Sequence, residues 1–129
     1  MLSLAKAQKL IVVVEDDRAV RHSLCFALEA QGYRVAAFAR AQEAIDSARS
    51  RLADCFLIDY ALPDRDGLAM LETLRRRGLT CPAIVIASNP SARCRAQARK
   101  AGAPLVEKPL MGETLHELIA DLLATPPAL

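Results

Sequence analysis

Short apolar runs alternate with segments of helical periodicity along the whole chain. The apolar runs are typical of central strands in a parallel sheet, which are buried on both faces. They predict strands at residues 10–14, 33–38, 55–58, 83–87 and 105–106. In the segments between them, apolar residues recur at spacings of three and four, which indicates helices that bury one face. These segments predict helices at residues 18–31, 41–50, 68–77, 92–101 and 113–124.

The strict alternation of strands with helices predicts a doubly wound α/β fold. In this fold, right-handed crossovers place five helices on the two faces of a five-stranded parallel sheet. The chain has 129 residues, enough for one domain and too few for two. We therefore expect a single domain with a core of about residues 9–124. Residues 125–129 are expected to form a tail or the start of a linker, because Pro126 and Pro127 cannot continue the last helix.

Composition narrows the class of protein further. The hydrophobic fraction is 53% and the charged fraction 25%, which is typical of a soluble globular domain and excludes disorder, collagen and a transmembrane anchor. Seventeen basic and fifteen acidic residues give a net charge of +2, well short of the basic excess of a dedicated nucleic-acid binder. The opening MLSLAKAQK lacks the apolar stretch of a signal peptide, so we expect a cytoplasmic setting.

The four cysteines are expected to be buried, reduced thiols. They are Cys25, Cys55, Cys81 and Cys94. They lie far apart without a C-x-x-C pair or a neighbouring histidine, so the sequence shows no zinc site. Disulfide frameworks belong to smaller secreted chains.

Charged residues follow three of the predicted strands. The first strand ends in Glu15 and Asp16, the third in Asp59, and the fifth is followed by Lys108. The carboxyl ends of parallel strands lie at one edge of the sheet, which is where such folds bind ligands. Carboxylates gathered there repel one another unless a cation lies between them, and Mg²⁺ prefers such oxygen ligands. Carboxylate, Mg²⁺ and lysine together suit phosphoryl transfer, in which an aspartate can be the nucleophile. For any one of these residues alone, the alternative is a charged side chain in a solvated loop.

With these residues in place, the chain resembles the receiver domain of bacterial two-component response regulators, including the chemotaxis and nitrogen-fixation regulators. The resemblance covers nearly the whole chain and is carried by VVVEDD (residues 12–17), LIDYALPDRDGL (57–68) and EKP (107–109). It implies a flavodoxin-like fold that accepts a phosphoryl group from the phosphohistidine of a sensor histidine kinase or phosphotransfer protein. It also implies a signalling domain rather than an enzyme, whose only reactions are self-phosphorylation and slow self-dephosphorylation.

The resemblance implies roles for the acidic residues. Asp59 matches the phosphoacceptor. Glu15 and Asp16 match the acidic pair that holds Mg²⁺, with Asp16 as the direct ligand and Glu15 acting through water. The backbone carbonyl of Ala61 would complete the protein ligands of the metal. Asp17 is instead expected to cap the first helix.

The remaining positions of the family motif match only in part. Lys108 resembles the lysine that contacts the phosphoryl group, and a cis peptide bond before Pro109 would direct it. The family's switch residue carries a hydroxyl, but here that position is Ala87. Either the neighbouring Ser88 supplies the hydroxyl or the hydrogen bond is absent. Leu105 occupies the position where the family usually has an aromatic switch residue.

Basic residues on the predicted helix 92–101 suggest a partner surface. They are Arg93, Arg95, Arg99 and Lys100. The family uses its fourth helix, fifth strand and fifth helix for dimerisation or output contacts, so a homodimer or an output partner is expected on this face. The alternative is an ordinary solvated helix face. We expect no membrane contact and no direct nucleic-acid contact from this domain.

Other functions remain open beside phosphorylation-dependent signalling. Ala87 and Leu105 favour a degenerate interaction domain that works without phosphorylation. A Mg²⁺-dependent phosphohydrolase with an aspartyl nucleophile would need a second aspartate two residues after Asp59, where this chain has Ala61. A flavin-binding protein is disfavoured because the acids after the first strand would repel phosphate.

Overall fold

The computed structural model describes residues 9–110 and 112–124, and within these ranges strands and helices alternate as predicted. In chain order the elements are β1 (Leu10–Val14), α2 (Arg18–Ala30), β2 (Arg34–Phe38), α3 (Ala41–Asp46), the 3-10 helix η1 (Ala48–Leu52), β3 (Cys55–Asp59), α4 (Gly67–Arg76), β4 (Ala83–Ala87), α5 (Ala92–Lys100), β5 (Leu105–Glu107) and α6 (Gly112–Ala124). The predicted tail at residues 125–129 lies outside the described residues.

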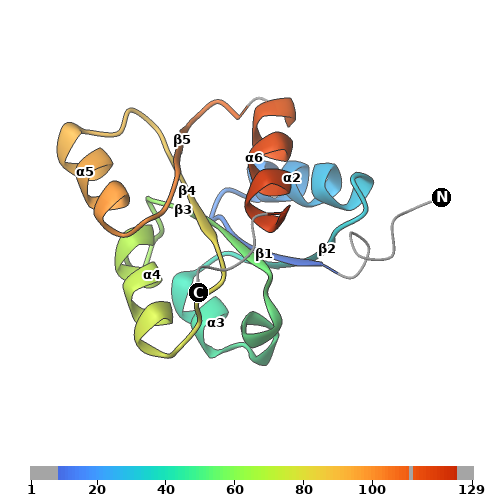
Figure 1. Cartoon of the computed structure of the whole chain (residues 1–129), viewed down its shortest axis with the longest axis horizontal. Coiled ribbons are helices and arrows are strands. Elements are labelled where there is room, and N and C mark those ends of the chain that lie inside the picture. The colour runs from blue at the N-terminus through green and yellow to red at the C-terminus, as the bar shows by residue number, and fades with distance from the viewer. Residues whose placement is uncertain (1–8, 111, 125–129) are drawn as a thin grey trace.

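The five strands form one parallel sheet in the order β2-β1-β3-β4-β5, which confirms the predicted doubly wound α/β class. Every residue of β1, β3 and β4 is buried, as the wholly apolar runs predict for inner strands. Helices α2 and α6 pack on one face of the sheet, and α3 and α4 pack on the other (Figure 1). The sheet therefore separates two apolar cores.

Side-chain caps begin three of the helices at positions that the sequence makes recognisable. Asp17, Asp66 and Ser91 each accept a hydrogen bond from a backbone N–H three residues later, at 3.0, 2.7 and 3.0 Å. Such caps satisfy backbone donors that the first helical turn leaves unpaired. The predicted capping role of Asp17 is confirmed.

The predicted helix at residues 41–50 is wrong in one respect, because it breaks at Ser47. Ser47 is extended, with φ −76° and ψ 131°, and its hydroxyl accepts a hydrogen bond from the Arg49 N–H at 3.2 Å. Serine side chains compete in this way with the hydrogen bonds of a helix. Three residues on, the buried Ser50 hydroxyl donates to the Ala44 carbonyl at 2.6 Å and joins the two short helices.

Two expectations from composition can be compared with the described residues. All four cysteines are free, as expected, but only Cys55 and Cys94 are buried; Cys25 and Cys81 are half-buried, so the expected burial is wrong for these two. In the described part of the chain, no helix combines the length and the apolar character needed to cross a membrane.

Candidate functional site

The register of the sheet brings the predicted charged residues to one edge. Val14 of β1 pairs with Ile58 of β3, so Glu15 and Asp59 are the next residues on neighbouring strands. On the other side of β4, the Lys108 N–H donates to the Ala87 carbonyl at 2.8 Å, immediately after β5. Residues from the ends of β1, β3 and β5 therefore meet at the carboxyl edge of the sheet.

The side chains of these residues converge on one another. The ammonium nitrogen Nζ of Lys108 lies 3.1 Å from Oε1 of Glu15 and 3.3 Å from Oδ2 of Asp59. Carboxylate oxygens of Glu15, Asp16 and Asp59 all lie within 4.8 Å of one another. Glu15 and Asp59 are only 1% and 4% exposed, whereas Asp16 is exposed. The result is a mostly buried acidic cluster, formed by Glu15, Asp16 and Asp59, with one lysine against it.

Burial changes the pKa values of the charged groups in this cluster. Desolvation by burial, followed by the neighbouring Asp59 carboxylate, raises the pKa of Glu15 from its ordinary value of 4.5 to about 7. Burial also acts to lower the pKa of Lys108, but the two carboxylates outweigh it and raise that pKa above its ordinary value. The lysine is therefore held as a cation, while Glu15 keeps a proton more readily than an exposed glutamate does.

The donor set fits a divalent cation. Oε1 of Glu15 is buried and makes no hydrogen bond, although the Lys108 ammonium lies 3.1 Å away. When all three carboxylates are ionised, their negative charge exceeds the charge of the lysine that pairs with two of them. Hard divalent cations such as Mg²⁺ bind carboxylate oxygens of this kind. The arrangement can hold such an ion between the acids and place an anion beside it and the lysine.

The loop after Asp59 is closed tightly against the end of β3. The Ala61 N–H donates to Oδ1 of Asp59 at 3.2 Å, and the Gly67 N–H donates to the Tyr60 carbonyl at 2.7 Å. A Cβ atom on Gly67 would lie 2.5 Å from the Asp59 carbonyl oxygen, so only glycine fits there. The carbonyl of Ala61 stays a predicted metal ligand.

The structure also places the residues at which the sequence departs from the family motif. Ala87 is the last residue of β4 and is 3% exposed, so a buried methyl group occupies the switch position. Ser88 is exposed and lies near Lys108 at one end of a groove. Leu105 is half-buried and packs on the α3 and α4 side of the sheet. The peptide bond between Lys108 and Pro109 is cis.

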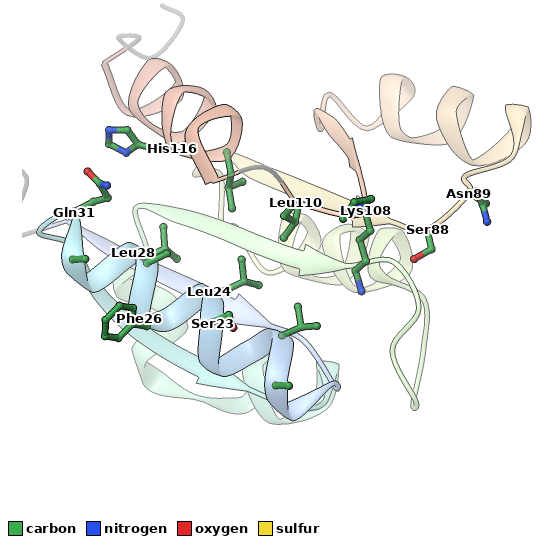
Figure 2. Close-up of a pocket in the computed structure, with 16 residues that line it drawn as sticks. Ser23, Leu24, Phe26, Leu28, Gln31, Ser88, Asn89, Lys108, Leu110 and His116 are labelled. Atoms are coloured by element: carbon green, nitrogen blue, oxygen red, sulfur yellow. The ribbon is translucent and has the colours of Figure 1, made fainter.

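A groove beside the acidic cluster was missed in the sequence. It has a volume of about 1050 Å³ and lies between α2, α6 and the segment that carries Lys108 (Figure 2). Leu24 and Leu28 point from α2 into it, whereas Phe26 lies on its outer rim and is 76% exposed. The signal available in the sequence was Phe26, a large aromatic residue that lies outside the apolar stripe of its helix. The buried leucines form that stripe.

Comparisons of the sequence with a family model and with curated proteins point to the same family. The family model of the response regulator receiver domain matches residues 11–120. The response regulator MprA of Mycolicibacterium vanbaalenii is 36% identical over 115 residues, which covers 88% of this chain and 48% of that protein. MprA of Mycobacterium tuberculosis is also 36% identical over 115 residues, covering 88% of this chain and 49% of that protein. The chain thus spans about half the length of these curated relatives.

Solved structures share the fold. A CheY-like response regulator receiver domain protein from Methanospirillum hungatei is 28% identical, with a TM-score of 0.79 over 89% of this chain and 93% of that one. The non-phosphorylated HemR receiver domain from Leptospira biflexa superposes with a TM-score of 0.85 over 94% of this chain and 99% of that one. At 24% identity the second comparison speaks to the fold alone.

Proposed function

This chain belongs to the response regulator receiver domain family, and we propose that Asp59 is the residue that accepts the phosphoryl group. The donor is the phosphohistidine of a sensor histidine kinase or phosphotransfer protein in the cytoplasm. The observation that carries the proposal is the buried Asp59 carboxylate, which contacts Lys108 and shares its edge of the sheet with two further acids. Residues 9–124 are proposed to form the core of a single receiver domain.

The side chains suggest how the transfer proceeds. A carboxylate oxygen of Asp59 attacks phosphorus, the bond from phosphorus to the donor imidazole nitrogen breaks, and an acyl phosphate forms while the imidazole leaves. Lys108 lies 3.3 Å from Oδ2 of Asp59, within reach of an incoming phosphoryl oxygen. Its raised pKa keeps the ammonium charged, which favours binding of the phosphoryl anion.

The acidic cluster is proposed to bind Mg²⁺. Asp16 and Asp59 would be direct ligands, Glu15 would act through water, and the Ala61 carbonyl would complete the protein ligands. When bound, the ion supplies positive charge where the phosphoryl oxygens carry negative charge. The support is that carboxylate oxygens of the three acids lie within 4.8 Å of one another, with Glu15 and Asp59 buried.

Ser88 is proposed to supply the hydroxyl that Ala87 lacks. Side chains alternate between the two faces of a strand, and Ile86 packs on the α2 and α6 face. By this alternation Ser88, two residues after Ile86, lies on the same face. Asp59 lies on that face as well, because it is two residues after Leu57. Ser88 and Lys108 also line the same groove (Figure 2).

Two surfaces are proposed for partners. The groove between α2 and α6 would receive the phosphodonor protein, because Lys108 lines it together with apolar residues, and Phe26 is exposed on its rim. The face formed by α5, β5 and α6 would bind an output partner or a second copy of the chain. On that face Arg95 pairs with Glu107 at 2.8 Å, while Arg93, Arg99 and Lys100 are exposed.

The proposed phosphorylation is tested by incubating the chain with an acyl phosphate donor and Mg²⁺ and measuring its intact mass. We expect the mass of one phosphoryl group to be added to the wild type but not to Asp59→Asn, and chelation of Mg²⁺ to prevent the addition. Rapid turnover of a small phosphate ester would instead favour a phosphohydrolase. No modification of the wild type would favour the phosphorylation-independent interaction domain, which the buried Ala87 methyl group and Leu105 make the second candidate.

A further inference from the structure

The outer part of the loop after Asp59 is bonded to a helix rather than left in solvent. Both carboxylate oxygens of Asp64 accept backbone hydrogen bonds from the first turn of α3, from the Ala41 N–H at 3.0 Å and from the Gln42 N–H at 2.9 Å. The residue at the N-cap of α3, Arg40, provides no side-chain cap of its own. Asp64 therefore caps α3 from a distance of 23 residues along the chain.

The neighbouring residue strengthens this connection. The guanidinium of Arg65 donates to the side-chain oxygen of Gln42 and reaches Oγ1 of Thr73 in α4 at 3.5 Å. Desolvation acts to raise the pKa of Asp64, but the N–H groups of Gln42 and Ala41 outweigh it and hold that pKa below its ordinary value. Asp64 is therefore ionised at neutral pH and accepts both bonds as a carboxylate, the stronger form of such a cap.

The segment that Asp64 holds is also bonded to the other half of the acidic cluster. The Glu15 N–H donates to the Phe38 carbonyl at 3.0 Å, and Phe38 lies only three residues before Ala41. On the opposite side, the Ala61 N–H donates to Oδ1 of Asp59 at 3.2 Å. A path thus leads from Glu15 through Phe38 and the start of α3 to Asp64, and from there along the acceptor loop back to Asp59.

We infer that Asp64 is a positioning residue for the acidic cluster, which fixes the acceptor loop relative to the Glu15 and Asp16 segment and so sets the affinity for a divalent cation. The inference rests on the proposed function, because the cation is the one proposed there. Strand pairing fixes Glu15 and Asp59 in any case, but Ala61 belongs to a loop whose outer end is bonded to α3 by Asp64 and Arg65. Without the Asp64 bonds, ordering that loop would oppose cation binding.

The test compares Asp64→Ala with the wild type in two measurements that need no phosphorylation. In calorimetric titration with MgCl₂ at 25 °C, we expect the dissociation constant to rise several-fold, less than the roughly tenfold or more that loss of a group bonded directly to a metal ligand costs. In the metal-free protein, amide hydrogen exchange should become faster at Ala61 as well as at Ala41 and Gln42. A cap that only stabilises α3 would accelerate exchange at Ala41 and Gln42 alone and leave Mg²⁺ affinity unchanged.

Two controls separate positioning from charge and from general stability. Glu43→Gln removes a negative charge from the same turn of α3, and Ser91→Ala removes the cap of α5. Both should bind Mg²⁺ within twofold of the wild type. If Asp64→Ala does not fold, the same two measurements are made on Asp64→Asn, whose side-chain amide keeps one acceptor oxygen and loses the other. Unchanged Mg²⁺ affinity in the folded variant overturns the inference, whereas a wild type that binds no Mg²⁺ contradicts the proposed function itself.

Discussion

Gly67 shows how one residue ties the stability of the fold to the geometry of the site. We predict that Gly67→Ala lowers the free energy of unfolding by about 1–3 kcal/mol, since the added Cβ would lie 2.5 Å from the Asp59 carbonyl oxygen and the backbone must move. Urea denaturation measures this cost. Phosphorylation by an acyl phosphate should also slow, because the moving carbonyl belongs to the acceptor residue.

Gly78→Ala is the matched control for that substitution. Gly78 has φ +85°, so alanine is strained there, at a cost of about 1–2 kcal/mol, but a Cβ would meet nothing within 4 Å. Its phosphorylation rate should equal that of the wild type. Equal slowing in both variants would show that lost stability, and not displacement of Asp59, is the cause.

Glu15 gives the chain a specific pH dependence in Mg²⁺-free buffer. Its pKa is raised from 4.5 to about 7 in the folded chain, so between these values the folded chain holds a proton that the unfolded chain releases. The free energy of unfolding should therefore fall as pH rises through this window. The fall, followed by denaturation at several pH values, should be smaller in Glu15→Gln, and identical pH profiles would contradict the assignment.

At the scale of residues, the chemistry could be predicted but its burial could not. The acids at the strand ends were recognisable because an apolar run stops abruptly at Glu15 and again at Asp59. The capping role of Asp64 depends on the Ala41 and Gln42 N–H groups, which only the folded chain brings to it.

At the scale of elements, the last turn of a helix can also bond to the segment that follows it. Arg75 at the end of α4 donates from Nη1 to the Leu79 carbonyl at 2.9 Å and to the Cys81 carbonyl at 2.7 Å. We predict that Arg75→Ala lowers the free energy of unfolding by about 1–3 kcal/mol, because two carbonyls of the connection to β4 lose a charged donor. Thermal or urea denaturation measures the change.

The adjacent Arg76 is the control for Arg75. Its ion pair with Glu72 spans 3.8 Å, and both side chains are 70% exposed. Arg76→Ala should therefore cost less than about 1 kcal/mol. Equal costs for the two variants would mean that the α4–β4 connection is not held by Arg75.

The elements themselves could largely be predicted because the inner strands are buried on both faces and leave uninterrupted apolar runs. Strand β4 was predicted to the residue at Ala83–Ala87. The division at Ser47 could not be predicted, because Ala-rich periodicity continues through it and a local hydroxyl bond decides the outcome. Helix boundaries elsewhere differ from the prediction by a residue or so, where caps rather than periodicity set the end.

At the scale of the whole molecule, the groove joins parts that are distant in the sequence. It is lined by α2 near the start of the chain and by Leu115 and His116 of α6 near its end. Phe26 was a local signal of an exposed apolar surface, but no local pattern could reveal the groove itself, since it depends on both helices packing on one face of the sheet. The family, in contrast, could be recognised from three short segments, which lie at the ends of β1, β3 and β5 and carry the charged residues of the site.

Phe26 allows the proposed docking surface to be tested separately from the chemistry. We predict that Phe26→Ala slows phosphoryl transfer from a phosphorylated kinase or phosphotransfer protein several-fold, because exposed aromatic anchors contribute strongly to protein interfaces. Its reaction with a small acyl phosphate should be unchanged, as Phe26 lies on the rim of the groove and away from Lys108 (Figure 2).

Leu52→Ala is the control for Phe26→Ala, since Leu52 is another large apolar residue that is 67% exposed but belongs to η1. Transfer rates measured with a purified donor decide between the two surfaces. A loss in Leu52→Ala equal to that in Phe26→Ala would place the docking surface elsewhere.

The position of each strand in the sheet has a consequence for how a signal leaves the site. The acids are attached to β1 and β3, each of which has a strand on both sides, whereas Lys108 follows the three-residue edge strand β5. A phosphoryl group newly attached to Asp59 shifts the backbone most easily where the fewest hydrogen bonds must stretch. We therefore expect the backbone to move first at Lys108 and then along the β5 edge of the sheet, while β1 and β3, which carry the acids, stay in place.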